Sequence, residues 1–80
     1  MHEVGIAQDI INSVFKQLEA HDYKRVSKIK LTVGDFNLIT QDSLQSCFDL
    51  LAENTKAQGA VLEIEQTQGM EIEINHIEAE

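Results

Sequence analysis

The chain has 80 residues, a formal net charge of −8 at neutral pH and an apolar fraction of 42%. This length allows one hydrophobic core, and the apolar fraction is ordinary for a globular protein. Because only six residues are lysine or arginine, the composition excludes a basic nucleic-acid-binding face and disfavours binding to anionic membranes. Metal ions and cationic surfaces are the partners that suit so acidic a protein.

Cysteine content and the lack of long apolar runs indicate a cytoplasmic protein. Cys47 is the only cysteine, so neither an internal disulfide nor a multi-cysteine zinc site is expected. No signal peptide or membrane span is predicted, because charges interrupt every apolar stretch. Cys47 also falls on the apolar stripe of a predicted helix, which favours a buried small side chain over a reactive thiol.

Two segments have the periodicity of amphipathic helices. The first runs from Val4 to about Ala20, and the second from an N-cap at Thr40 to about Asn54. Their apolar positions are Ala7, Ile10, Ile11, Val14, Phe15 and Leu18 in the first helix and Leu44, Cys47, Phe48 and Leu51 in the second.

Three segments alternate between apolar and polar residues, as half-buried strands do. They are Lys28–Val33, Ala60–Glu65 and Met70–Ile74. The alternation of the third slips by one position afterwards, which predicts a β-bulge near Asn75 and His76. The inward-facing residues of the first two strands are expected to be Ile29, Leu31, Val33, Leu62 and Ile64.

The element order α-β-α-β-β predicts a two-layer α/β sandwich, a three-stranded sheet with two helices on one face. Because the link between the last two strands is short, we expect these strands to form an antiparallel hairpin. The open face of the sheet should carry cross-strand Lys–Glu pairs worth a few tenths of a kcal/mol each.

No catalytic set can be assembled from the sequence. His21 is expected at a helix end and His76 at a strand bulge, and nothing in the sequence places either histidine beside Cys47 in a catalytic triad. The four glycines are scattered and form no phosphate-binding loop. The sequence therefore predicts that the chain is not an enzyme.

The first three residues offer donor atoms for a metal ion. The Met1 amine, the His2 amide nitrogen and the His2 imidazole Nδ1 can chelate one ion, and Glu3 can add its backbone nitrogen or its carboxylate. Nitrogen-rich tetragonal donor sets suit Ni(II) or Cu(II). The alternative is that His2 and Glu3 are only the polar lead-in to the first helix, with Glu3 favourable near its positive end.

Five stretches of the sequence resemble the HypA/HybF family, the nickel metallochaperones of NiFe-hydrogenase maturation. The start, beginning Met-His-Glu, is the most specific of them, and the resemblance covers nearly the whole chain. The five stretches are Met1–Ile10, Ile29–Phe36, Ser43–Leu51, Gly59–Glu65 and Gly69–Glu78.

The resemblance implies a Ni(II) site made of Met1, His2 and Glu3. It also implies that residues 1–80 form a single nickel-binding domain. The family normally carries a four-cysteine zinc-binding insertion between the last two strands, and here residues 66–69 stand in its place. No zinc is therefore expected.

The resemblance further implies a HypB-type GTPase or a nickel-enzyme precursor as the partner that receives the metal, and a homodimer is another candidate assembly. The alternative function is a metal-free interaction subunit that keeps the HypA-like fold and docks on a partner protein.

Overall fold

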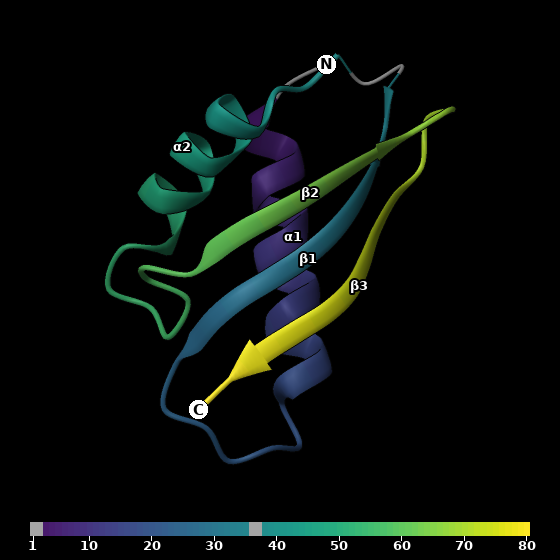
Figure 1. Ribbon diagram of the computed structural model, residues 1–80. Coiled ribbons are helices and arrows are strands. Elements are labelled where there is room, and N and C mark those ends of the chain that lie inside the picture. Colours follow the sequence, from purple (N-terminus) through teal and green to yellow (C-terminus); the bar gives the residue numbers. More distant parts are fainter. Residues whose placement is uncertain (1–2, 36–37) are drawn as a thin grey trace.

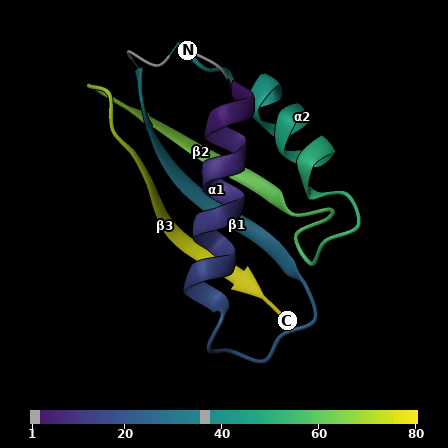
Figure 2. The ribbon, with the colours of Figure 1, turned by 180° about the vertical axis from the view of Figure 1, so that it is seen from behind.

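The computed structural model describes residues 3–35 and 38–80. Its elements, in chain order, are α1 (Glu3–Leu18), β1 (Val26–Gly34), α2 (Gln41–Ala52), β2 (Val61–Thr67) and β3 (Ile72–Ala79). Both helices lie on one face of the three-stranded sheet, and the other face is open (Figures 1 and 2). The predicted two-layer α/β sandwich and its order α-β-α-β-β are confirmed.

The helices begin and pack as their sequences predict. The Thr40 side chain accepts a hydrogen bond from the Ser43 backbone nitrogen, which makes Thr40 the N-cap of α2. No helix in the described parts of the chain is long and apolar enough to cross a bilayer. The buried residues of the two helices are Ala7, Ile10, Ile11 and Val14 in α1 and Leu44, Phe48 and Ala52 in α2.

The predicted hairpin between the last two strands is wrong. The strand order is β2-β1-β3, with β1 in the centre, parallel to β2 and antiparallel to β3. Parallel strands need a crossover of about a dozen residues or more, and the segment containing α2 supplies it. The inward residues Ile29, Leu31 and Val33 of β1 are buried as predicted. Alternation predicts which face of the sheet a side chain lies on, but it does not predict which strand lies beside it.

The link from β2 to β3, residues 68–71, crosses over the end of β1. Two strand spacings are about 10 Å, and four extended residues reach about 13 Å, so this link is just long enough. Its passage requires a glycine at position 34. A Cβ there would press on the carbonyl oxygen of Gly69 and lie 2.8 Å from the Met70 nitrogen. Gly69 itself has φ +112°, a conformation that favours glycine.

The outer edge of β2 is covered by side chains from α2. Gln45 donates from Nε2 to the Ala60 carbonyl at 3.1 Å and accepts from the Leu62 nitrogen at 2.8 Å. Gln41 donates to the Leu62 carbonyl at 3.1 Å. The Gln45 amide thus occupies the place of a neighbouring strand's peptide group, which protects this edge from pairing with another chain.

The predicted irregularity in β3 is also present. Leu31 pairs with Ile74 and Lys30 with His76, so Asn75 is the extra residue of a bulge. After the bulge, Ile77 continues the row that packs against the core.

We expect Gly34→Ala to lower the free energy of unfolding by about 1–3 kcal/mol, because the added methyl group meets backbone that cannot move aside without shifting the link. Gly5→Ala is the matched control: its Cβ would meet nothing within 4 Å, and it lies in α1. This control should gain about 0.5–1 kcal/mol. Urea unfolding of both variants checks this, and equal stabilities would contradict the crossing described here.

We expect Gln45→Ala to cost about 1–3 kcal/mol, since it leaves the partly buried Leu62 N–H without its acceptor. Gln8→Ala serves as the comparison, because among the described residues the side chain of Gln8 bonds only to Asn12, at an exposed position of the same helix. Its loss should be a few tenths of a kcal/mol. If the two variants unfold at the same urea concentration, Gln45 does not stabilise the β2 edge.

Candidate metal centre

Of the three predicted nickel ligands, the structure places Glu3 alone. Met1 and His2 lie outside the described residues. Glu3 is the first residue of α1 and is half-buried. A carboxylate in the first turn of a helix is stabilised by the positive end of the helix dipole. The predicted site therefore adjoins the start of α1, and its assembly remains a prediction.

The end of the molecule that carries the start of α1 also carries two connections. The loop before α2 and the β2–β3 link lie at this same end (Figures 1 and 2). One hydrogen bond ties the link to the end of β1, because the Gly69 nitrogen donates to Asp35 Oδ1 at 3.2 Å. Three chain segments that are remote in sequence thus lie at the end of the molecule where α1 starts.

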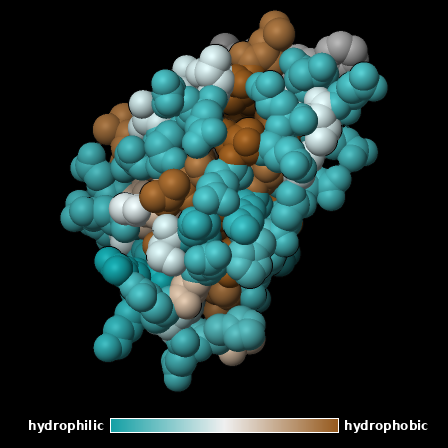
Figure 3. All heavy atoms as spheres, viewed as in Figure 1, coloured by the Kyte–Doolittle hydropathy of each residue, from teal (hydrophilic) through white to brown (hydrophobic). Residues whose placement is uncertain are grey.

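Apolar side chains are exposed on these same segments. Val4 is 56% exposed, Leu38 88% and Met70 72%. Hydrophobic atoms gather at the upper end of the face seen in Figure 3, while most of that face is hydrophilic. Leu38 also has φ 53°, a conformation that a non-glycine residue adopts only at a cost.

No local sequence pattern singles out these exposed apolar residues. The sequence feature that could have identified them is an apolar side chain in a connection between elements, where a polar side chain is usual. This feature points to a surface only when the connections are known to lie at the same end of the molecule.

His21 and His76 lie away from Glu3. Both line a shallow pocket with Gln17 and Leu18, at the C-terminal end of α1. A helix of 16 residues is about 24 Å long, which separates this pocket from the start of α1. His76 Nε2 lies 3.5 Å from Glu78 Oε2, and both side chains are about half exposed. The two histidines are therefore not neighbours of Glu3, the predicted nickel ligand that the structure describes.

Within residues 3–35 and 38–80, no three histidine, cysteine, aspartate or glutamate side chains are grouped so as to hold a metal ion. Cys47 is half-buried and packs against the core. It serves as a small packing residue, although it is less buried than the sequence predicted.

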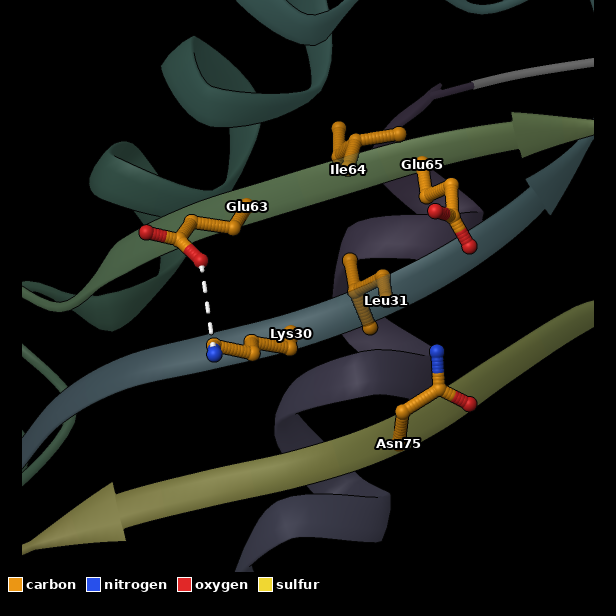
Figure 4. A pocket seen from close by; sticks show the side chains of 6 residues that line it. All are labelled: Lys30, Leu31, Glu63, Ile64, Glu65 and Asn75. Carbon is orange, nitrogen blue, oxygen red and sulfur yellow. Dashed lines mark ion pairs between the residues drawn. The ribbon is translucent and has the colours of Figure 1, made fainter.

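The open face of the sheet carries a row of charges around a shallow pocket (Figure 4). Lys28 Nζ lies 3.1 Å and Lys30 Nζ 4.0 Å from the Glu63 carboxylate, which confirms the expected cross-strand pairs. The hydrogen bond to Glu63, together with the charges of Glu63 and Glu78, raises the pKa of Lys28 above its ordinary value. The raised pKa keeps the Lys28 amine protonated, and a protonated amine is not a nucleophile.

Residues 1–79 match the protein family described as HypA, a hydrogenase and urease nickel incorporation metallochaperone. The chain belongs to the HypA family. This confirms the resemblance seen in the sequence. The family description is that of an accessory protein, which agrees with the prediction that this HypA-family chain is not an enzyme.

Curated relatives carry the name hydrogenase maturation factor HypA. One from Psychromonas ingrahamii is 42% identical over 65 residues, covering 81% of this chain and 57% of the relative. One from Nostoc sp. is 37% identical over 70 residues, covering 88% and 59%. One from Dehalococcoides mccartyi is 32% identical over 66 residues, covering 82% and 56%. The HypA-family chain thus spans little more than half the length of these relatives.

The fold is that of a solved family member. The solution structure of the nickel metallochaperone HypA from Helicobacter pylori superposes with a TM-score of 0.81 at 14% sequence identity, and covers 99% of this chain and 97% of the other. At this identity the likeness shows the fold alone.

Proposed function

We propose that this chain binds one Ni(II) ion at its N-terminus and delivers it for the maturation of a nickel enzyme such as NiFe-hydrogenase. The observation that carries the proposal is the family match over residues 1–79, which includes the Met-His-Glu start. The ligands are the Met1 amine, the His2 imidazole and amide nitrogen, and Glu3 through its amide or its carboxylate. The metal is cargo, and the chain performs no turnover of its own.

The donor chemistry supports nickel. Amine, amide and imidazole nitrogens within two residues form fused chelate rings, and such nitrogen-rich tetragonal sets favour Ni(II) and Cu(II) over Mg²⁺ and Ca²⁺. The amine and the amide must lose protons on binding, so nickel affinity should rise with pH. Glu3 starts α1, so the site would be anchored to the folded domain at its third residue.

Delivery requires a surface where the recipient docks beside the metal. The exposed Val4, Leu38 and Met70 lie on three segments at one end of the molecule, the end where α1 starts. Exposed apolar groups at a single end favour association with another protein. We propose that a HypB-type GTPase or a nickel-enzyme precursor docks on this end.

We further propose that residues 1–80 are the nickel-binding domain alone. The β2–β3 link joins two strand ends across β1 in four residues, 68–71, so this position is closed by a turn. The single cysteine of the chain, Cys47, lies in α2, away from this link. A four-cysteine zinc site therefore cannot form at the link from residues of this chain.

Nickel titration of protein with a native N-terminus tests the site. His2→Ala removes a ligand and should weaken nickel binding by more than the roughly 10–100-fold that follows loss of an outer-shell partner. A form extended by four glycines before Met1 should also bind weakly, because the terminal amine is then too far from His2 to join it in one set of fused chelate rings. His21→Ala is the matched control, since it removes an exposed histidine at the other end of α1 and should bind nickel as the parent does.

Equal nickel affinity in the parent, His2→Ala and the extended form would show that the N-terminal site is wrong. If none of the forms binds nickel, the chain acts instead as a metal-free interaction subunit.

A further inference from the structure

The two outer edges of the sheet differ in how their backbone groups are satisfied. On β2, Gln45 and Gln41 occupy backbone donors and acceptors. On β3, the only side chain of the described residues that bonds to the backbone is Ser27, which reaches the Glu78 carbonyl from the paired β1 side. An edge without such cover is a template for a further strand.

We propose that the outer edge of β3, with the groove between β3 and α1, binds an extended segment of a partner protein in which basic and apolar residues alternate. This inference goes beyond nickel binding and does not depend on it, because no residue that carries it belongs to the predicted metal site.

The register of the sheet shows which backbone groups face the open edge. The Gly34 nitrogen donates to the Glu71 carbonyl at 2.7 Å, so Glu71 directs its carbonyl toward β1. Antiparallel strands alternate between residues that bond to the neighbour and residues that face away from it. Ile72 and Ile74 therefore direct their N–H and C=O groups outward, where an added strand would pair.

A groove beside this edge can receive side chains of the added strand. It has a volume of about 170 Å³ and lies between α1 and β3. A cavity of about 150 Å³ holds a benzene-sized group, so one large apolar side chain fits. Backbone pairing at an edge with alternate side chains in pockets is the usual mode of strand addition. The groove is lined by Ile6, Asp9, Ile10, Ser13, Ile72 and Ile74.

The charges around the groove determine the chemistry of the occupant. Asp9 lies in the groove lining, and the exposed Glu71 and Glu73 flank Ile72. Strand β3 contains no lysine or arginine, and α1 contains one, Lys16. Strand alternation places Glu71 and Glu73 on the open face of the sheet, opposite the groove that Ile72 lines. An added strand would therefore place its apolar face on the groove side and its polar face beside these glutamates, where lysine or arginine side chains would complement their charge.

A second copy of the chain fits this edge poorly. Two β3 strands side by side would bring Glu71, Glu73 and Glu78 of each copy near those of the other, and like charges opposed across strands are destabilising. The charge pattern thus favours a basic partner over self-association.

The probe is a fluorescein-labelled eight-residue peptide of alternating lysine and valine, followed by fluorescence anisotropy. A block peptide with four lysines and then four valines has the same charge and composition but cannot place them on opposite faces of a strand. The alternating peptide should bind at least about fivefold more tightly, as expected for roughly 1 kcal/mol of cross-strand contacts. Equal binding of the two peptides would reduce the effect to net charge and overturn the proposal.

Glu73→Lys and Glu65→Lys form a matched pair that locates the site. Both glutamates are exposed and both pair with Thr32, Glu73 from β3 and Glu65 from β2, so the two variants change charge equally on opposite edges. Glu73→Lys should weaken binding of the alternating peptide about fivefold, and Glu65→Lys less than about twofold. Equal losses of peptide affinity in the two variants would overturn the assignment to β3. Dimerisation of the protein through the β3 edge in the absence of peptide would also overturn it.

Discussion

Pairing of β1 along both of its edges is the constraint on which the rest of the structure depends. The parallel pairing of β1 with β2 requires a crossover connection, which contains α2. This crossover places α2 on one face of the sheet. The antiparallel bond to β3 then requires the chain to pass over the end of β1, which is achieved by the close approach of Gly69 to Gly34. Through these two connections β1 brings the β2–β3 link and the loop before α2 to the end where α1 starts.

Much of this arrangement could be predicted from the sequence, because periodicity reports which side of an element is buried. Both helices, the N-cap at Thr40, the inward row of β1 and the bulge at Asn75 follow from local patterns. Strand order does not follow from local patterns, because a short link between two strands fits either a hairpin or a passage over the end of one intervening strand. The helix between the first two strands was the better guide, as it is typical of a parallel pair.

The candidate site could be predicted only as far as its donor atoms. The Met-His-Glu start indicates metal chelation, and the family match supports nickel. Val4, Leu38 and Met70 come to one end of the molecule because the strand order brings remote segments there, which no local pattern encodes. The same holds for the cover that Gln45 provides on β2, because a polar residue in a helix has no sequence signature of this role. The two ends of α1 thus separate the predicted metal ligand Glu3 from the histidine pair His21 and His76.

The most direct test of nickel at the N-terminus is a nitrogen–proton correlation NMR spectrum recorded before and after one equivalent of nickel is added. Planar, nitrogen-bound Ni(II) is diamagnetic, so the backbone signals stay sharp and their shifts report position. We predict that the largest changes fall on Glu3 and Val4, at the start of α1, and that the signals of His21 and His76 stay where they were. Largest changes at His21 and His76 would contradict it, because they would place the metal at the opposite end of the helix.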